Sequence, residues 1–388
     1  MTAAALPDLE NVAVARRHGT FALRRGRLSQ LRSGEVRFRV LHASLCGTDR
    51  QIARGDRADT APVLGHEGVA EVAAVGEGVM GYAVGDRVVF NPVNPNDQDE
   101  ILGHSTEGLF QRYLTFAAAD LERRALVVTA PRGLASAACV LAEPLGTVVY
   151  THELLRRAGP PASLVVVGAG PIGILHALYA ARIARVPRVR LVANTEARAR
   201  WVVQRSVLPA ADVVLWDEPH GERLARSLAG SGAVLLCVPA RAMATALDWA
   251  LAAVADGGVI GLVGGAGSRQ IDALPGTDLV AIRRANVCGS LPANDPAVTA
   301  VRARDGRRVG LFGQRGAAAR HLRAALAVLS DDAIFARVLT HRASFAALPG
   351  LLDSLARCAR IDGAECVKLL VDATAERASV ETIDGGCA

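Results

Sequence analysis

Two hydrophobic patterns divide the chain. From about Gly34 to Phe90, β-branched and polar residues alternate between glycine turns, as in "EVRFRVLHASL" and "GVAEVAAVGEGV". Alternation with a period of two is typical of strands with one buried face, so this region predicts an all-β, barrel-like unit. The segment from Asn91 to Gly108 is dense in Pro, Asn and Asp, and we expect a long loop there.

The pattern changes after about Ala142, where uninterrupted apolar strands such as "SLVVV" alternate with helical stretches. Such runs are typical of a parallel, doubly wound sheet. Further buried strands are expected at "AVLLCVP", "GVIGLVGG" and "ANVCGS", and past Leu291 the pattern is mixed again. We therefore predict a β-barrel domain over residues 1–150, completed by residues 296–388, with a nucleotide-binding domain over residues 151–295 inserted in it.

The composition of the chain argues against nucleic-acid-binding, disulfide-rich and membrane proteins. The formal charge is +6, but Lys368 is the single lysine and the arginines are interspersed with acids, so no tract suited to nucleic acid is expected. The seven cysteines have no regular spacing and form no C-x-x-C pair, which favours a reducing compartment. The start lacks a signal-peptide pattern and no run is long enough to span a membrane, so we expect a cytoplasmic protein.

The stretch "VVVGAGPIG" forms a glycine-rich turn between a strand and a helix. Gly168, Gly170 and Gly173 follow the G-x-G-x-x-G pattern, and Pro171 and Ile172 begin the helix. The first glycine permits a tight turn, the second lets a pyrophosphate approach the backbone, and the third lets helix pack on strand. A purely structural turn is the alternative, but the strand and helix context favours dinucleotide binding.

The cofactor's 2′ position is normally read at the end of the next strand, where an acidic residue selects NAD. This chain has Ala193 and Asn194 there, with Arg198 and Arg200 close behind. The missing carboxylate and the nearby arginines favour NADP, although NAD stays open. Both arginines could instead be solvated helix residues.

Three dispersed residue types suggest a metal site. Cys46 lies in "LCGTD", His66 and Glu67 follow in "LGHEG", and Glu143 lies in "LAEPLG". A thiolate, an imidazole and a carboxylate are the ligands of a catalytic zinc with one open position. Each residue alone has a structural explanation as a buried or helix-start side chain. Their combination with a dinucleotide-binding turn favours the metal.

These motifs together resemble the zinc-dependent medium-chain dehydrogenase/reductase family, the alcohol dehydrogenase superfamily. The matching pieces are "CGTD", "GHEGVAEVAAVGEGV", "GDRV", "EPLG" and "GAGPIG", in the family's order, and the resemblance covers about Gly34 to Asp372. One departure is Ala70, where the signature usually has glycine. The resemblance implies a GroES-like β-barrel catalytic domain and a Rossmann domain.

Carried over residue by residue, the resemblance implies that Cys46, His66 and Glu143 bind zinc, with Glu67 beside the metal. In some polyol dehydrogenases the two carboxylates exchange these roles. Thr48 matches the hydroxyl that hydrogen-bonds the substrate oxygen. The resemblance also implies that the zinc lowers the pKa of a bound alcohol before hydride passes to the nicotinamide.

The resemblance also marks two differences from the histidine-relay alcohol dehydrogenases. Gln51 stands where many relatives carry the histidine that accepts the final proton, so water or another group, such as Glu67 or His42, must take that role. The family's structural zinc needs four cysteines in the lobe that matches Asn91 to Gly108, which has none. We therefore expect one zinc per chain, with Asp49 bracing the metal-binding loop.

Several details resemble the glucose dehydrogenase branch, namely "CGTDR", Asn194 and the segment "GSLPAND", whereas "EPL" resembles sorbitol-type enzymes. Both branches act on polyhydroxylated substrates, so a sugar, polyol or cyclitol is expected, with His104 and Glu107 of the loop as candidate hydroxyl-binding groups. Val238, Val263 and Ser290 are further candidate cofactor contacts. A homodimer or homotetramer is expected from the family.

Two other functions stay open at this point. One is a zinc-free enone or quinone reductase of the same superfamily, which would lack the cysteine and histidine ligands. The other is a non-catalytic cofactor-binding protein, which would be expected to lose Thr48 or a ligand. This chain retains all of these residues.

Overall fold

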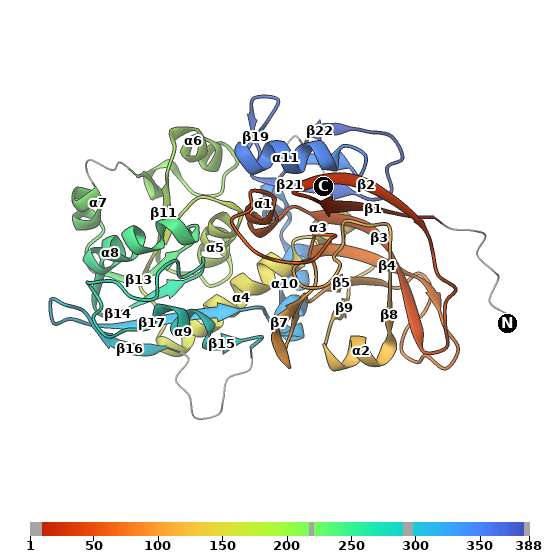
Figure 1. The fold of residues 1–388 in the computed structure, drawn as a ribbon. Helices are drawn as coiled ribbons and strands as arrows, with labels where there is room; N and C mark the ends of the chain where they lie inside the picture. Colours follow the sequence, from red (N-terminus) through yellow and green to blue (C-terminus); the bar gives the residue numbers. More distant parts are fainter. Residues whose placement is uncertain (1–9, 217–220, 290–297, 384–388) are drawn as a thin grey trace. The chain divides into compact units, whose positions relative to one another are not determined.

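The computed structural model describes residues 10–216, 221–289 and 298–383. These residues fall into two compact units. The first contains the residues up to Glu143 and those from Leu322 onward, and the second is Pro144–His321. Each unit is organised around its own sheet (Figure 1).

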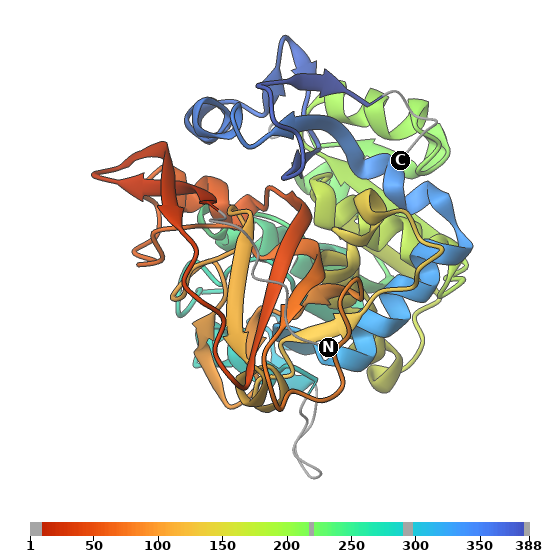
Figure 2. The ribbon, with the colours of Figure 1, turned by 90° about the vertical axis from the view of Figure 1, so that its right-hand side faces the viewer.

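The first unit is built mainly from antiparallel strands. Its largest sheet has the order β22-β18-β21-β3-β4-β5-β9, and β8 pairs with β3. The blue C-terminal strand β21 pairs with the red-orange β3, so the end of the chain completes a sheet begun by its first third (Figure 2). Its N-terminal and middle strands are β1 (Glu10–Arg17), β2 (Thr20–Arg27), β3 (Glu35–Ser44), β4 (Glu67–Val75), β5 (Arg87–Phe90), β6 (Val93–Asn94), β7 (Asp97–Ile101), β8 (Tyr113–Ala117) and β9 (Val127–Thr129). Its C-terminal strands are β18 (Leu339–Ser344), β19 (Arg360–Ile361), β20 (Ala364–Glu365), β21 (Lys368–Asp372) and β22 (Val380–Thr382).

The helices of the first unit are short, apart from α10 and α11. They are α1 (Gly47–Ala53), α2 (Ala118–Arg123), α3 (Ser136–Cys139), α10 (Ala319–Asp331) and α11 (Leu348–Arg357). Helix α10 starts in the second unit and continues into the first. The core of the first unit is a cluster that includes Phe38, Phe90 and Phe110, all fully buried. It packs against the inward faces of β3 and β4, whose alternation the sequence predicted.

The second unit contains a sheet with the order β12-β11-β10-β13-β14-β17-β15, in which all of these neighbours are parallel and β16 joins β17 antiparallel. This is the doubly wound arrangement that the apolar runs predicted. Its strands are β10 (Ser163–Val167), β11 (Arg188–Ala193), β12 (Val213–Leu215), β13 (Ser231–Leu236), β14 (Val254–Leu262), β15 (Asn286–Val287), β16 (Thr299–Arg302) and β17 (Arg308–Arg315). Its helices are α4 (Ala142–Ala158), α5 (Pro171–Arg182), α6 (Glu196–Gln204), α7 (Gly221–Ser227), α8 (Met243–Ala253) and α9 (Leu279–Arg284).

Two expectations differ from the observed fold. The segment predicted as a long loop, Asn91 to Gly108, carries the hairpin β6-β7. Asn94 turns the chain by accepting a hydrogen bond from the backbone of Asn96 at 3.0 Å. The inserted unit also ends later than residue 295, because β17 pairs with β14 and so extends the parallel sheet.

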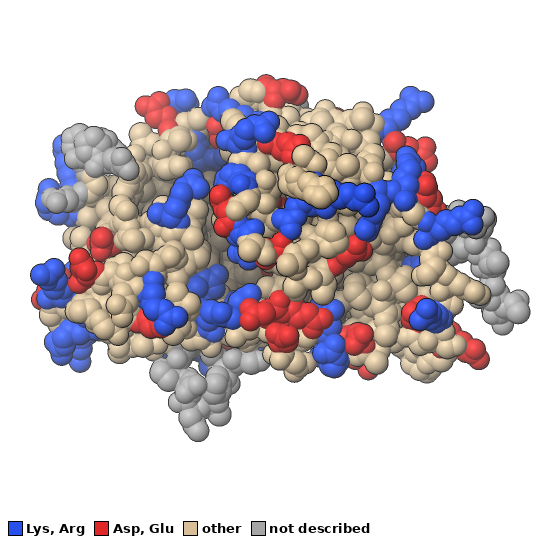
Figure 3. Space-filling model, in the orientation of Figure 1, with Lys and Arg blue, Asp and Glu red and all other residues tan. Residues whose placement is uncertain are grey.

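Charged side chains of both signs are interspersed on the face drawn in Figure 3. Many arginines pair with nearby acids, such as Arg24 with Glu107 and Arg25 with Glu10. Among the described helices, none combines the length and the apolar character needed to cross a lipid bilayer.

Candidate active site

Cys46 lies at the end of β3, where it caps helix α1. Its backbone N–H donates to Asp49 Oδ2 at 2.8 Å, and its Sγ lies 3.5 Å from the backbone nitrogen of Thr48. Asp49 Oδ1 also accepts a hydrogen bond from the backbone of Gly65 at 3.3 Å. The fully buried carboxylate of Asp49 therefore ties the Cys46 loop to the residue before His66.

His66 and Glu67 come next, at the start of β4. Gly65 has φ +91, and a Cβ there would lie 2.6 Å from the ring of Phe110, so glycine is required at this turn. In the sheet register Glu67 pairs with Ser44, the residue two positions before Cys46. This pairing brings the two ligand segments together although 19 residues separate Cys46 from His66 in the sequence.

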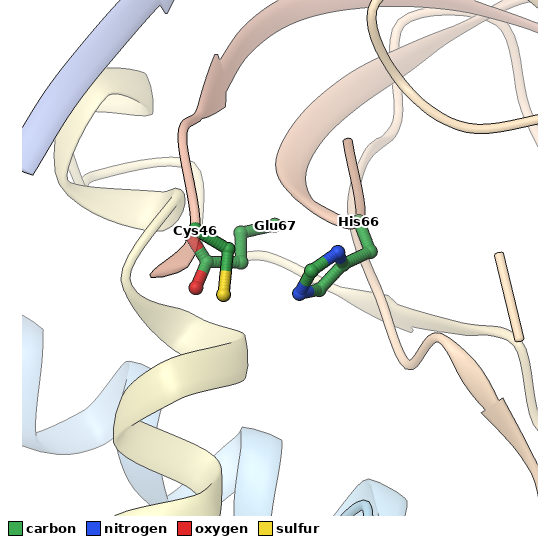
Figure 4. A group of neighbouring side chains, drawn as sticks. All are labelled: Cys46, His66 and Glu67. Carbon is green, nitrogen blue, oxygen red and sulfur yellow. The ribbon is translucent and has the colours of Figure 1, made fainter. Parts of the chain in front are cut away.

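The side chains of Cys46, His66 and Glu67 converge on one point (Figure 4). Their ligand atoms all lie within 4.8 Å of one another, and in the described part of the chain no other three His, Cys, Asp or Glu side chains meet in this way. Burial works to lower the pKa of His66, but interactions with the side chains of Cys46, Asp49 and Glu67 raise it well above its usual value. The cluster therefore favours a positive charge at its centre.

Lys368 also belongs to this site, although the sequence did not indicate it. Its ammonium group pairs with Glu67 Oε2, and Ser44 Oγ donates to the same oxygen. Both charged side chains are almost fully buried, and Lys368 Nζ also lies 3.4 Å from the carbonyl oxygen of Leu45. Burial works to raise the pKa of Glu67, but the charge of Lys368 lowers it overall, so the carboxylate is ionised. A lone lysine within the apolar strand "CVKLLVD" was the available signal.

Glu143 lies in the first turn of α4 and is not one of the three converging residues. Burial raises the pKa of its carboxyl to about 7, and the positive charge of His66 opposes this rise. His66, Glu67 and Asp49 also act on this pKa through their charges, so Glu143 is electrostatically coupled to the cluster.

Thr48 and Gln51 both lie on α1, and both side chains are partly exposed. His42, named as an alternative proton acceptor, is buried in β3. Its Nε2 lies 3.3 Å from Arg342 Nη2 and 3.9 Å from Asp372 Oδ2. Burial lowers the pKa of His42, so the imidazole is neutral near pH 7 and acts as an acceptor for the arginine.

His104 and Glu107, the two candidate hydroxyl-binding residues of the segment Asn91 to Gly108, lie in different surroundings. The ring of His104 is buried against His66, with ring centroids 4.8 Å apart and an interplanar angle of 89°. His104 Nδ1 also lies 3.5 Å from Asp59 Oδ1. Glu107 instead forms an exposed ion pair with Arg24. Of this pair, His104 is therefore the residue beside the candidate metal ligands.

The donor set fits a zinc ion. One sulfur, one imidazole nitrogen and one carboxylate oxygen are the ligand types of catalytic zinc. Both the Lys368 and Ser44 bonds use Oε2 of Glu67, so neither engages Oε1. Asp49 Oδ1 lies 3.9 Å from Nδ1 of His66, beyond hydrogen-bond distance, so its carboxyl group acts on the imidazole through its charge.

The glycine turn of the second unit joins β10 to α5. Gly168 has φ +106, and a Cβ there would lie 2.5 Å from the carbonyl oxygen of Cys237. A Cβ on Gly173 would lie 1.8 Å from the carbonyl oxygen of Gly168, whereas one on Gly170 would meet nothing within 4 Å. Pro171 begins α5, as expected of a residue with no free N–H to offer. Open space at Gly170 above a helix N-terminus matches the approach of a pyrophosphate.

The other candidate cofactor residues follow strand ends of the same sheet. Asn194 is exposed directly after β11, while Arg198 is buried on α6, where its backbone is capped by Thr195. Val238 and Val263 follow β13 and β14. The predicted contact Ser290 lies outside the described residues.

Residues 32–124 match the family model of the alcohol dehydrogenase GroES-like domain. Among curated proteins, a glucose 1-dehydrogenase of Thermoproteus tenax is 35% identical over 166 residues, which cover 37% of this chain and 46% of the relative. The chain thus spans about half the length of the curated relatives it matches. Other curated relatives are named 2-dehydro-3-deoxy-L-galactonate 5-dehydrogenase and L-threonine 3-dehydrogenase.

Solved structures share the whole fold. The short chain alcohol dehydrogenase rspB of Escherichia coli CFT073, complexed with NADH, superposes with a TM-score of 0.67 at 19% identity, covering 94% of this chain and 99% of that chain. The 2R,3R-butanediol dehydrogenase of Bacillus subtilis gives a TM-score of 0.68 at 20% identity, covering 94% and 100%. At these identities the likeness concerns the fold.

Proposed function

We propose that the chain belongs to the medium-chain dehydrogenase/reductase superfamily, also called the alcohol dehydrogenase superfamily, and that it is a zinc-dependent oxidoreductase that uses NADP or NAD. It moves a hydride between the nicotinamide and a secondary alcohol or hemiacetal of a sugar, polyol or cyclitol. The observation that carries this proposal is the convergence of Cys46, His66 and Glu67 in a chain that also has a dinucleotide-type glycine turn.

Cys46 and His66 would hold the zinc ion together with a carboxylate from Glu67 or Glu143. When bound, zinc supplies a Lewis acid that lowers the pKa of an alcohol oxygen. The chain's own residues prepare this site. Asp49 fixes the cysteine loop and the turn before the histidine, and Lys368 balances the charge of Glu67 so that the buried cluster does not carry an uncompensated acid.

Thr48 and Gln51 form the path by which the proton of the substrate hydroxyl leaves the site. The Thr48 hydroxyl accepts a hydrogen bond from the substrate hydroxyl and can donate its own proton onward. The amide of Gln51 relays a hydrogen bond but cannot hold a proton near neutral pH. Because Gln51 is partly exposed on α1, we assign the final proton acceptor to water.

The second unit binds the cofactor. The N-terminus of α5 offers free N–H groups to the pyrophosphate, and Gly170 leaves room for it. Asn194 and Arg198 follow the strand end where NAD-specific proteins carry an acid, which favours NADP over NAD. In this assignment the first unit forms the catalytic domain, the second unit binds the dinucleotide, and the protein is a homodimer or homotetramer.

The substrate class is tested by an absorbance screen at the reduced nicotinamide band. Purified protein is assayed with NAD and NADP against aldoses, polyols and aminocyclitols. The expected result is turnover of at least one polyhydroxylated substrate, with NADP preferred. Cys46→Ser should abolish turnover while leaving cofactor binding nearly intact, because the two sites lie in different units. Cys358→Ser is the matched control, since Cys358 is an exposed cysteine of the same unit.

Other outcomes of this screen identify the competing functions. Turnover of enones or quinones that persists in Cys46→Ser would indicate a zinc-free reductase. Tight cofactor binding without turnover of any substrate class, in protein loaded with zinc, would indicate a non-catalytic cofactor-binding protein.

A further inference from the structure

A cluster of side chains in the second unit surrounds the end of β15. It consists of Tyr150 and Glu153 of α4 and Arg320 and His321 of α10. The rings of Tyr150 and His321 are stacked, with centroids 4.6 Å apart and an interplanar angle of 17°. Tyr150 and His321 are buried. Glu153 connects the cluster, because its carboxylate pairs with both Arg320 and His321.

The hydrogen bonds of the cluster define its protonation. His321 Nδ1 accepts from the backbone of Ala318 at 3.0 Å, so its Nε2–H donates to Glu153 Oε2 at 2.8 Å. Arg320 Nη2 lies 3.3 Å from both carboxylate oxygens of Glu153 and donates to the carbonyl oxygen of Gly289 at 3.2 Å. An ionised Glu153 therefore orients the arginine that holds Gly289.

The backbone held by this cluster is strained. Cys288 has φ +48 and Gly289 has φ +70, so two consecutive residues adopt the left-handed conformation, which strains the backbone at Cys288 and is tolerated at Gly289 because it is glycine. A Cβ on Gly289 would lie 2.8 Å from Cε1 of His321 and 3.0 Å from Nη2 of Arg320. Strained backbone persists only where its surroundings hold it, and it concentrates at functional sites.

Cys288 and Gly289 lie at the ligand-binding edge of the sheet. They directly follow β15, which is parallel to β17, as β17 is to β14. Ligands of doubly wound sheets bind outside the carboxyl ends of the strands. The glycine turn after β10 and the strands β11 and β12 form the half that holds the adenosine, so the half with β14, β17 and β15 receives the nicotinamide nucleotide.

We propose that Glu153 is a positioning residue that, through Arg320 and His321, holds Cys288 and Gly289 in the conformation required by the nicotinamide half of the cofactor. The inference rests on the proposed function, because it assumes a nicotinamide dinucleotide. It adds to that function a residue on α4 that touches neither cofactor nor substrate and yet sets the affinity for one half of the cofactor.

The test compares the two halves of the cofactor in Glu153→Gln. The amide keeps the shape of the side chain but loses the charge that orients Arg320. Dissociation constants are measured for NADPH and NADH by energy transfer from tryptophan, and for ADP-ribose and its 2′-phosphate by displacement. We expect binding of the reduced dinucleotide to weaken about tenfold, which corresponds to the loss of one charge-assisted contact. Binding of the ADP-ribose compounds should stay within twofold of wild type.

Two matched controls separate positioning from general damage. Arg157 is an exposed partner of Glu153 at 3.1 Å that does not contact Gly289, so Arg157→Gln should leave all four constants unchanged. Gly289→Ala should reproduce the Glu153→Gln pattern. Gly276→Ala has a similar φ of +74 but no neighbour within 4 Å, and should not reproduce it.

Unchanged NADPH and NADH binding in Glu153→Gln, or equal weakening of the ADP-ribose compounds, would overturn the inference. Should Glu153→Gln not fold, the comparison of Gly289→Ala with Gly276→Ala decides in its place. A wild-type protein that binds neither dinucleotide would overturn the proposed function and this inference together. If the wild type binds the dinucleotides and turns over substrate, and Glu153→Gln binds them with the same affinity, only the inference about Glu153 is overturned.

Discussion

Two buried histidines in the second unit make its stability depend strongly on pH. His152 of α4 and His176 of α5 lie with ring centroids 5.5 Å apart, and among the described residues neither nitrogen of His176 has a hydrogen-bond partner. Burial lowers the pKa of His152 to about 3 and holds that of His176 well below its usual value. Both imidazoles are therefore neutral in the folded protein.

The magnitude follows from proton linkage. An unfolded histidine has a pKa of about 6.5, so below that pH the unfolded chain binds a proton that the folded chain does not. For one histidine the free energy of unfolding then falls by about 2 kcal/mol between pH 8 and pH 5. This figure is insensitive to the folded pKa provided that it stays below about 4. The stability is present above pH 6.5 and is lost as the pH falls toward the folded pKa of His152, about 3.

His152→Gln tests this reasoning. The variant should lose about 2 kcal/mol less stability than the wild type between pH 8 and pH 5, because one of the two titrating groups is gone. All three tryptophans, Trp201, Trp216 and Trp249, lie in the second unit, so urea unfolding followed by tryptophan fluorescence reports on that unit alone.

The control is Tyr179→Phe. The Tyr179 ring contacts His152 with centroids 4.7 Å apart, so this change perturbs the same packing without removing a histidine. It should shift stability equally at all pH values. If the pH curves of His152→Gln and wild type run parallel, the imidazoles are not held neutral and the reasoning is refuted.

Three further predictions follow from single residues. Lys368→Met should lower the free energy of unfolding of the metal-free protein, measured by circular dichroism, by about 3 to 5 kcal/mol, because it leaves Glu67 buried and unpaired. Lys368→Arg should keep most of the stability. An unchanged free energy of unfolding in Lys368→Met would mean that the pair is not buried. Ala193→Asp should shift the ratio of NADPH to NADH affinity toward NADH, and an unchanged ratio would show that the 2′ position is read elsewhere. Gly170→Ala should fold with normal stability but bind the cofactor at least tenfold more weakly. The added Cβ of alanine has space in the protein but none beside a pyrophosphate. A cofactor affinity equal to that of wild type would mean that the pyrophosphate binds away from this turn.

The sequence could predict the elements whose signal is local. Strand β10 and its turn were predictable because a continuous apolar run and the glycines Gly168 and Gly173 lie within one short stretch. Cys46, His66 and Glu67 were named from a family resemblance, and the structure brings their ligand atoms within 4.8 Å. Their spacing alone would not have shown this.

Features that depend on distant contacts could not be predicted. Lys368 and Glu67 are 301 residues apart in the sequence, so only the pairing of β21 with β3 brings them together. The strand β17 was not recognised because "RVGLFGQR" mixes apolar, charged and glycine residues, although the middle of the strand is buried. The hairpin in the former loop depends on Val93 and Ile101 packing inward, which a composition rich in Pro, Asn and Asp conceals.

The central claim is that Cys46, His66 and a neighbouring carboxylate form a zinc site on which turnover depends. The most direct measurement is zinc content and turnover in the same samples of wild type and Cys46→Ser, before and after chelation and re-addition of zinc. We expect one zinc per wild-type chain, loss of turnover with the metal and recovery on its return. Cys46→Ser should contain no zinc and show no turnover but still bind the dinucleotide. Full turnover in zinc-free wild type would contradict the central claim.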